Sequence, residues 1–193
     1  MFERDTVGIA ADRLLFGHGS LAQPLSWRAA GMLNQVTESD GTSAIWIQRE
    51  VLEPFHELLK TDEGQADLSS DGRWIAFVLR SHDTARFEVF IASADDPTLR
   101  RQLSNGGGAQ PTWRADGHEL YYIDSAHRVV AVDFHDGQVG ATTPLFAIPI
   151  ENVFYANRDF APARDGQRFV VNLPLKQVRR ASATVVVQVQ VAE

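Results

Sequence analysis

Three side chains near the end of a predicted strand carry the strongest candidate chemistry in this sequence: Asp133, His135 and Asp136. Carboxylates and imidazoles both ligate divalent cations, so a metal-assisted site is one interpretation of this group. A solvated loop is the simpler one, because no histidine forms an H-x-x-x-H or H-E-x-x-H pattern. The six histidines that could supply bases or ligands are His18, His56, His82, His118, His127 and His135.

A serine nucleophile is not indicated. Gly17-His18-Gly19-Ser20 resembles part of a nucleophile elbow, but Leu21-Ala22 follows Ser20, so the G-x-S-x-G order is not met. A turn is the expected structure there. The sequence contains no cysteine, which excludes thiolate nucleophiles, thiolate metal sites and disulfides. We therefore expect no catalytic residue, no metal site and no cofactor.

Two loops and one basic cluster have simple structural interpretations. Asn105-Gly106-Gly107-Gly108 precedes no predicted helix, and a phosphate cradle needs a helix N-terminus or a nest of amides, so a connector is expected. Asp95-Asp96-Pro97 predicts a turn. The cluster Lys176, Arg179 and Arg180 falls between two predicted strands, where a solvated hairpin loop is favoured and an acidic partner is the alternative.

Tryptophans recur at or near equivalent points of an internal repeat: Trp27, Trp46, Trp74 and Trp113. Core packing between repeats is the expected role of such large apolar side chains. Aromatic side chains exposed at the mouth of a repeat array would instead suit a peptide or sugar ligand. Trp27, Trp113, Asp133 and His135 are therefore our candidate ligand surface.

The elements that must position these residues are set by the repeat itself. Residues 22–31 read AQPLSWRAAG and residues 109–117 read AQPTWRADG. Looser copies end at Gly72 and Gly166, and the glycines at 31, 72, 117 and 166 are separated by 41, 45 and 49 residues. About 40 to 50 residues is the period of a four-stranded propeller blade.

Strand signals inside each repeat agree with that period. An Asp-Gly turn signal precedes predicted strands at Trp74–Val78, Leu120–Ile123 and Phe169–Val171, with a weaker one at Met32–Val36. Second strands are predicted at Ala44–Ile47, Glu88–Ala92, Val129–Phe134 and Thr184–Val191, all rich in β-branched and aromatic residues. Shorter third strands are predicted at Glu57–Leu59, Arg101–Leu103 and Leu145–Ile148. Residues 54–60 could be helical, but their place in the repeat favours a strand.

These patterns predict an all-β chain, a single β-propeller domain over residues 1–193 with four-stranded antiparallel blades. The expected repeats are 20–63, 64–107, 108–156 and 157–193, and residues 1–19 hold a remnant strand near Ala11–Phe16. A closed propeller usually has about four to eight blades. Three arrangements stay open: a closed four-bladed ring, a truncated larger ring, and a partial ring completed by a second copy. A partial ring is favoured, because the N-terminal segment before the first repeat is eroded and too short for a blade, and the unpaired edges of such a ring would promote self-association.

Composition limits the partners. The chain has 44% hydrophobic and 22% charged residues, as in ordinary globular proteins, and a formal net charge of −7, which disfavours nucleic acid. No apolar run approaches the roughly 18 residues that span a bilayer, and the charged start, Met1 to Asp5, is not typical of a signal peptide. A complete chain would be cytoplasmic. The C-terminal part of a membrane-anchored protein could be extracytoplasmic.

Three segments resemble the TolB-type propeller repeat, which is also WD-like: residues 71–77, DGRWIAF; residues 87–91, FEVFI; and residues 101–122, RQLSNGGGAQPTWRADGHELYY. The likeness covers about residues 20–191 and is greatest to propellers at the C-terminus of bacterial serine/threonine kinases and transcriptional regulators. Residues 165–172 and 183–187 resemble the last blade of such domains. The resemblance implies a sensor or docking platform, usually of six or more blades. Kinase catalytic motifs are absent, since neither a Gly-rich phosphate loop nor a His-Arg-Asp loop occurs.

The sequence therefore predicts a non-catalytic binding or sensor module for a protein or peptide, within a larger bacterial signalling or envelope protein. Similar propellers also cap hydrolases of the prolyl oligopeptidase type without holding their catalytic residues. Two enzymatic alternatives thus stay open, the accessory propeller of a hydrolase and a propeller enzyme with a metal-assisted site. A structural fragment without a separate function is a further alternative.

Overall fold

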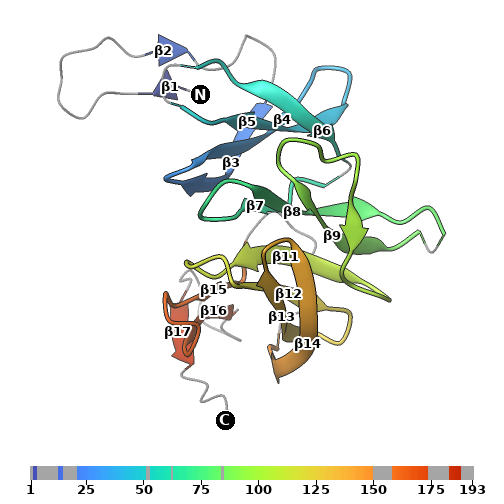
Figure 1. The fold of residues 1–193 in the computed structure, drawn as a ribbon, viewed down its shortest axis with the longest axis vertical. Helices are drawn as coiled ribbons and strands as arrows, with labels where there is room; N and C mark the ends of the chain where they lie inside the picture. The colour runs from blue at the N-terminus through green and yellow to red at the C-terminus, as the bar shows by residue number, and fades with distance from the viewer. Residues whose placement is uncertain are drawn as a thin grey trace.

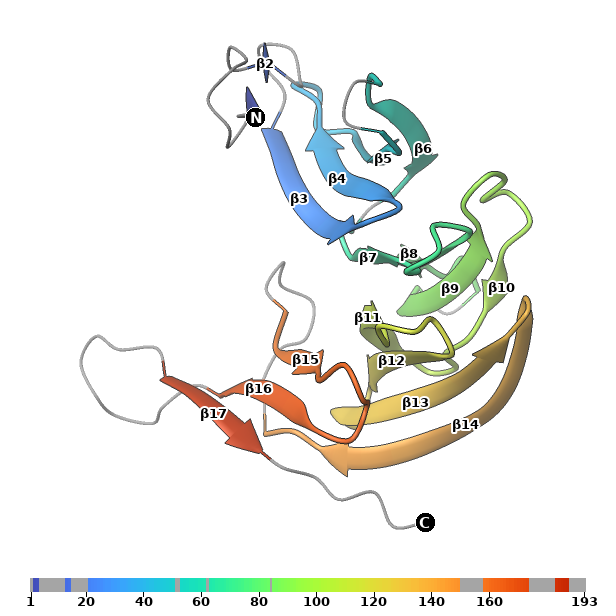
Figure 2. The same cartoon turned by 60° about the vertical axis from the view of Figure 1, so that its left-hand side comes forward.

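The computed structural model describes residues 2–3, 13–14, 21–50, 53–61, 63–83, 85–149, 158–173 and 183–187. Within these ranges the secondary structure is strands and turns, without a helix. Four antiparallel sheets follow one another along the chain, and each contains consecutive strands. They are arranged as the blades of a partial propeller, in an arc whose two ends do not meet (Figures 1 and 2).

The first two sheets have four strands each, in chain order from the inner to the outer edge. Blade 1 consists of β3 (Leu21–Arg28), β4 (Gly31–Thr37), β5 (Ser43–Gln48) and β6 (His56–Lys60). Blade 2 consists of β7 (Ala66–Leu68), β8 (Trp74–Arg80), β9 (Phe87–Ser93) and β10 (Arg101–Gln102). Residues 56–60 are thus a strand, as their repeat position predicted.

The remaining sheets continue this pattern. Blade 3 consists of β11 (Gly108–Trp113), β12 (Glu119–Asp124), β13 (Arg128–His135) and β14 (Gln138–Ala147). In blade 4 the described strands are β15 (Phe160–Pro162), β16 (Phe169–Leu173) and β17 (Ala183–Val187). A separate ladder pairs β1 (Phe2–Glu3) with β2 (Arg13–Leu14). We predicted a remnant strand within residues 1–19, and these two short segments are the part of that range that the structure describes.

Tight turns join the first two strands of each blade, and their glycines explain the repeat signature. Gly72, Gly117 and Gly166 have φ values of +72°, +76° and +70°, a left-handed conformation that side chains with a Cβ disfavour. The predicted Asp-Gly turns are confirmed. In blade 1, where Ala30 replaces the aspartate, a shorter hairpin forms because Arg28 pairs directly with Gly31.

The inner strands β3, β7, β11 and β15 are elements that the strand prediction did not include. Their segments contain proline and turn-like residues, and the pairing register shifts at Pro24/Ser26 in blade 1 and at Ala109/Thr112 in blade 3. Such bulges disrupt the regular alternation of apolar and polar residues that reveals a strand. The Ala-Gln-Pro motif is therefore itself a strand rather than a lead into one.

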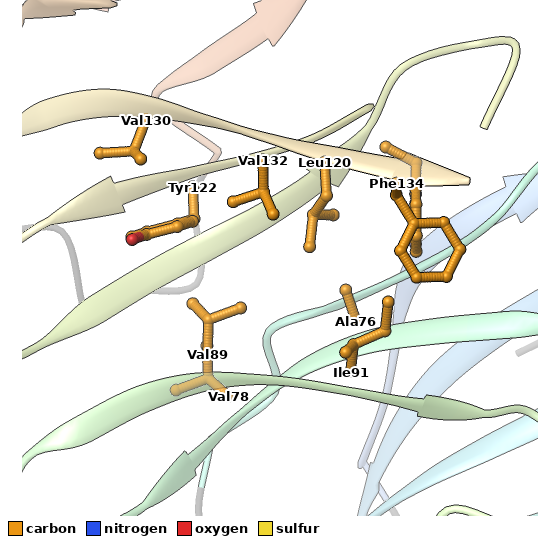
Figure 3. Close-up of a cluster of buried hydrophobic side chains, with 10 residues drawn as sticks. Ala76, Val78, Val89, Ile91, Leu120, Tyr122, Val130, Val132 and Phe134 are labelled. Atoms are coloured by element: carbon orange, nitrogen blue, oxygen red, sulfur yellow. The ribbon is translucent and has the colours of Figure 1, made fainter. Parts of the chain in front are cut away.

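The hydrophobic core is divided into layers between successive blades. In the layer between blades 2 and 3, side chains of β12 and β13 point towards those of β8 and β9 (Figure 3). Phe134 contacts Trp74 and Trp113 edge to face, with ring centroids 5.2 Å and 5.0 Å apart. Equivalent layers join blades 1 and 2 and blades 3 and 4. Each internal blade thus buries both of its faces, which fixes the loops at its two ends.

Candidate functional site

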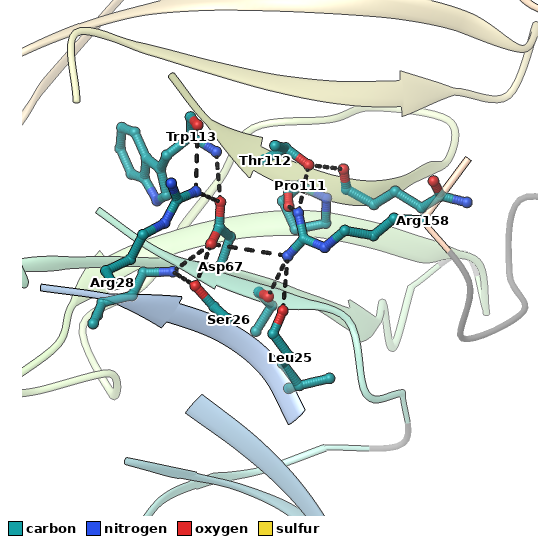
Figure 4. A network of polar contacts seen from close by, with 11 residues as sticks. Leu25, Ser26, Arg28, Asp67, Pro111, Thr112, Trp113 and Arg158 are labelled. Atoms are coloured by element: carbon teal, nitrogen blue, oxygen red, sulfur yellow. Dashed lines mark hydrogen bonds and ion pairs between the residues drawn. The ribbon is translucent and has the colours of Figure 1, made fainter. Parts of the chain in front are cut away.

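A buried carboxylate joins the inner strands of three blades. The side chain of Asp67 in β7 accepts hydrogen bonds from Ser26 Oγ at 2.5 Å, Arg28 Nη2 at 2.6 Å and the Trp113 backbone amide at 2.8 Å (Figure 4). These donors come from β3 and β11, the inner strands of the neighbouring blades. A buried carboxylate with such partners is a structural joint rather than a free acid or base.

Arg158, which precedes β15, extends this joint to blade 4. Its guanidinium donates to Thr112 Oγ1 at 2.8 Å, to the Ala66 carbonyl at 3.0 Å and to the Leu25 carbonyl at 3.2 Å. One side chain from blade 4 therefore contacts the inner strands of the other three blades (Figure 4). The five donors and planar shape of arginine suit this kind of multiple contact.

A second set of links repeats from blade to blade. Gln65, Gln110 and Asp159 each lie seven residues before the turn glycine of their blade. The Gln110 backbone amide donates to Gln65 Oε1 at 2.8 Å, and the Asp159 backbone amide donates to Gln110 Oε1 at 2.8 Å. The Gln110 side chain also donates to Asp159 Oδ2 at 2.7 Å. The polar residues of the inner strands are thus used to assemble the arc.

A small pocket lies between blades 2 and 3, at the end where their turns meet. Its volume is about 100 Å³. Three turns line it with carboxylates, two imidazoles, a guanidinium and two aromatic rings, and the lining residues are Ser69, Asp71, Arg73, Trp74, Asp116, Gly117, His118, Phe134, His135 and Asp136. This pocket is the candidate functional site, because it brings charged and aromatic groups together in a hollow.

Two of the pocket carboxylates are held in their charged form. Burial raises the pKa of Asp71, but hydrogen bonds from Ser69 and Arg73 outweigh it, so the pKa is lowered. The hydrogen bond from Arg114 is the main cause that lowers the pKa of Asp116, and the backbone amide of His118 adds to it. Both side chains are therefore anionic at neutral pH. With Asp136 the pocket is lined by three carboxylates, of which Asp71 is paired with Arg73 and Asp116 with Arg114.

Two of the six histidines meet at this pocket. The rings of His118 and His135 lie with centroids 5.2 Å apart, one from the β11–β12 turn and one from the end of β13. His56 and His82 are exposed elsewhere, His127 is half-buried, and His18 lies outside the described residues. The proximity of His118 and His135 could not be predicted from spacing, because it depends on the pairing of β12 with β13.

The Asp133, His135 and Asp136 group is only partly brought together. His135 and Asp136 line the pocket, whereas Asp133 pairs with Glu119 in the sheet and its Cβ lies against Gly140. Within the described ranges, no three side chains among His, Cys, Asp and Glu are arranged to hold a metal ion.

The two tryptophans of the repeat motif have opposite environments. Trp27 pairs with Met32 and Trp113 pairs with Leu120, so the two occupy the same position in blades 1 and 3. Trp27 is 76% exposed, whereas Trp113 is 1% exposed and packs between blades 2 and 3. Trp113 therefore has to be removed from the predicted ligand surface, and Trp27 stays in it.

The prediction that tryptophans recur at or near equivalent repeat positions is wrong for the other two tryptophans. Trp74 begins β8 and Trp46 lies in the middle of β5, so neither occupies the position that Trp27 and Trp113 share. Trp74 lines the pocket and was missed as a candidate site residue. Asp67 and Arg158 were also missed, and no short motif marks them, because their partners come from other blades.

The glycine-rich connector behaves as predicted, with an added role. Residues 103–107 link β10 to β11, and the backbone amides of Gly106 and Gly107 donate to Glu88 Oε1 at 3.0 Å and 2.9 Å. Ser104 Oγ donates to the other oxygen of this buried carboxylate. The amide nest thus binds an anion of the chain itself. Asp95–Pro97 forms part of the predicted turn, and Lys176, Arg179 and Arg180 lie outside the described residues.

Comparison with known proteins identified structural but no sequence relatives. No protein-family model and no curated protein matches the sequence.

In the described part of the chain, no helix combines the length and the hydrophobicity that crossing a bilayer requires.

Solved structures share the fold. TolB from Acinetobacter baumannii has a TM-score of 0.65 at 13% identity, over 96% of this chain and 47% of that one. A putative TolB from Agrobacterium tumefaciens has a TM-score of 0.56 at 16% identity, over 84% of this chain and 57% of that one. The β-propeller domain of the Trilobed protease from Pyrococcus furiosus has a TM-score of 0.52 at 13% identity, with coverages of 89% and 58%.

This chain spans about half the length of the structures it matches, which agrees with an arc whose ends do not meet. Identities of this size establish the fold and leave ligands undetermined. The similarity to the propellers of kinases and transcriptional regulators stays a prediction. The chain has a partial β-propeller fold like that of TolB.

Proposed function

We propose that this propeller is a non-catalytic module that binds a protein segment at the inner end of blade 1. The observation that carries the proposal is the exposure of Trp27. Its equivalents in blades 2 and 3, Leu68 and Trp113, are both buried against the preceding blade. Trp27 is thus an exposed large aromatic side chain on a strand paired in the sheet, the residue type that most often dominates protein interfaces.

The contacts that the charged residues make within the protein support a non-catalytic role. Asp67, Arg28 and Arg158 are engaged in contacts between blades, and Glu88 is engaged by the connector. A catalytic acid or base has to exchange protons with a substrate, which a buried and fully hydrogen-bonded carboxylate cannot do easily. These residues therefore build the scaffold that presents Trp27.

A randomised peptide library displayed on phage tests the proposed function. We expect the immobilised protein to enrich peptides, and the Trp27→Ala variant to bind the selected peptides at least about tenfold more weakly, as is usual for a dominant interface side chain. Leu99→Ala is the matched control, because Leu99 is also a large apolar side chain and is 81% exposed. Equal loss of binding in both variants, or no loss in either, would contradict the proposal.

The non-catalytic part needs a test of its own. We expect a model ester such as p-nitrophenyl acetate to be hydrolysed equally by the wild type and by a triple variant, Asp133→Ala, His135→Ala and Asp136→Ala. A hydrolysis rate that disappears in the triple variant would show that this group is catalytic, and the proposal would then be wrong.

An accessory role within a peptidase is the second candidate function. The propeller domain of the Trilobed protease has the same fold, and that domain is part of a protease. The encoding reading frame distinguishes the two candidates. An in-frame hydrolase domain supports the accessory role, whereas an in-frame kinase, DNA-binding or membrane-anchoring segment supports a signalling or envelope protein.

Self-association through the open end of the arc is the final part of the proposal. Val170 in β16 is 39% exposed, whereas Leu33, Ala76 and Tyr121 at the equivalent position of blades 1 to 3 are buried. An uncovered blade face of this kind favours association. Light scattering should show a mass that increases with concentration, and Val170→Glu should reduce that increase. A monomer at all concentrations would contradict self-association.

A further inference from the structure

The interface between blades 1 and 2 contains an arginine that fills the space where the turns meet. Arg49, which follows β5, donates from Nη1 to the Gly72 carbonyl at 2.9 Å and from Nη2 to the Ala94 carbonyl at 3.2 Å. It also forms an ion pair with Asp95, with Nη2 and Oδ1 2.7 Å apart. Two carbonyls and one carboxylate thus form a binding site for a guanidinium at this interface.

A similar site occurs one interface further along, at the pocket between blades 2 and 3, with an imidazole where the first site has a carboxylate. The Ala94 amide donates to the Arg73 carbonyl at 2.8 Å, and the Phe134 amide donates to the His118 carbonyl at 2.9 Å. This shared bond aligns Ala94 with Phe134, and therefore Gly72 with Gly117 and Asp95 with His135. These three equivalents, Gly117, Phe134 and His135, all line the pocket.

A different residue stands at the position of Arg49 in blade 2. Gln48 pairs with Met32 and Ala92 pairs with Ile75, and both pairs occupy the same place in their sheets. The next residue along the chain is Arg49 in blade 1 and Ser93 in blade 2. A serine side chain is several atoms too short to make the contacts of Arg49, so the hollow is not filled from that position.

The chemistry of the pocket suits the same cation. Asp136 follows His135 in the turn at its rim, and the two further carboxylates, Asp71 and Asp116, are already paired with Arg73 and Arg114. Trp74 and Phe134 provide aromatic surface for the planar guanidinium or for its aliphatic stem. Arg73 opposes a second cation, but its Nε is paired with Asp71 Oδ2 at 2.6 Å, which partly neutralises it.

We propose that the pocket between blades 2 and 3 binds the guanidinium of an arginine side chain presented by a partner protein. The partner's arginine takes the place that Arg49 takes between blades 1 and 2, with the Gly117 and Phe134 carbonyls as acceptors and Asp136 as counter-ion. This inference rests on the proposed binding function and adds to Trp27 a second contact of defined chemistry.

An NMR titration with N-acetyl-L-arginine amide, which mimics an arginine within a chain, tests the inference. We expect saturable shifts of the Gly117, His118 and Asp136 amides and of the Trp74 indole, with a dissociation constant on the order of millimolar for so small a probe. The citrulline analogue has the same shape without the charge, and it should bind on the order of tenfold more weakly. Equal binding of the two probes would overturn the inference. Binding of free L-arginine without binding of N-acetyl-L-arginine amide would also overturn it.

The Ser93→Arg variant provides the sharpest control, because it places an arginine where blade 1 has Arg49. The new side chain should occupy the pocket and abolish the shifts caused by the probe. Asp136→Asn should weaken the probe by at least about threefold, as expected for the loss of one partly exposed counter-ion. Asp83→Asn removes an exposed carboxylate outside the pocket lining and should leave binding unchanged.

Two results would overturn the inference regardless of how the variants fold. A Ser93→Arg protein with a native spectrum and unchanged probe binding would show that the pocket is not the site. If Ser93→Arg does not fold, a loss of affinity in Asp83→Asn equal to that in Asp136→Asn would show unspecific charge attraction. Phage peptides that depend on Trp27 but bind Ser93→Arg normally would contradict this inference alone. Arginine-amide binding that survives Trp27→Ala, with no Trp27-dependent peptide, would contradict the proposed function alone.

Discussion

At the scale of single residues, most charged side chains of the inner strands act as connectors between blades. Asp67 shows why: its carboxylate is 1% exposed and receives donors from blades 1 and 3. A buried charge is tolerated only where charged and amide donors replace its hydration. The sequence could not indicate this role, because an aspartate in an Ala-Asp-Leu segment has the same local pattern whether it is exposed or buried.

The Asp67→Asn substitution should destabilise the fold. It keeps the shape of the side chain but leaves the Arg28 guanidinium without its anion, and removal of one member of such a pair costs about 3 kcal/mol. Urea unfolding monitored by circular dichroism measures the change. Asp83→Asn, at an exposed turn position, should change stability by less than about 0.5 kcal/mol. Similar values for the two variants would mean that the Asp67 joint does not stabilise the arc.

Tyr121 gives a prediction for alkaline pH. Burial raises the pKa of its phenol, and the hydrogen bond to Glu119 raises it further. Because the folded pKa is higher than the unfolded one, Tyr121 stabilises the fold fully below about pH 10 and loses this contribution as the pH rises beyond it. Tyr121→Phe should therefore be less stable than the wild type near neutral pH, and the difference should shrink towards about pH 11. A difference that stays constant with pH would contradict this assignment.

At the scale of elements, the middle strands of each blade could be predicted and the inner strands could not. The apolar runs Trp74–Val78 and Leu120–Ile123 lie within β8 and β12. These strands are buried on both faces, and a strand buried in this way has a continuous apolar sequence that can be recognised. The segment Ala109–Trp113 contains proline, a bulge and Gln110 at a φ of +56°. The bulge and the φ of Gln110 do not follow from residue type alone, since the Gln110 amide is bonded to Gln65 of the neighbouring blade.

The candidate site was predictable only in part, for the same reason. His135 and Asp136 were found from their types and spacing, but Trp74, Asp71 and Arg73 belong to another blade and come together with them only in the fold. Trp27 and Trp113 have the same motif, so the sequence could not show which one is exposed. The neighbouring blade decides that, because it covers Trp113 and not Trp27.

The connector between β10 and β11 is sensitive to a single added methyl group. Gly107 has a φ of +120°, its amide binds Glu88, and a Cβ there would lie 3.2 Å from the Ser125 Cβ. We expect Gly107→Ala to cost about 2 kcal/mol in unfolding free energy. Gly41→Ala is the matched control, since Gly41 also has a positive φ but open space around it. The connector has no special role if both variants lose the same stability.

At the scale of the whole molecule, four blades are held in an arc by polar contacts along the inner strands and by apolar layers between the faces. Arg158 reaches the inner strands of the other three blades, which limits how far the arc can open (Figure 4). The predicted partial ring is confirmed, and the likeness to TolB covers nearly the whole chain. Trp27 is exposed at one end of this arc, and the pocket of Asp136 and His135 lies between blades 2 and 3.

One repeat position is buried between blades in blade 3 and exposed in blade 1, where we propose that it binds a partner. Fluorine NMR of the protein labelled with 5-fluorotryptophan, with each signal assigned by a Trp→Phe variant, tests this claim most directly. We predict that the Trp27 signal shifts between H₂O and D₂O and moves when a selected peptide is added, whereas the Trp113 signal does neither. A protected Trp27, or a Trp113 that is equally accessible to solvent, would contradict the account.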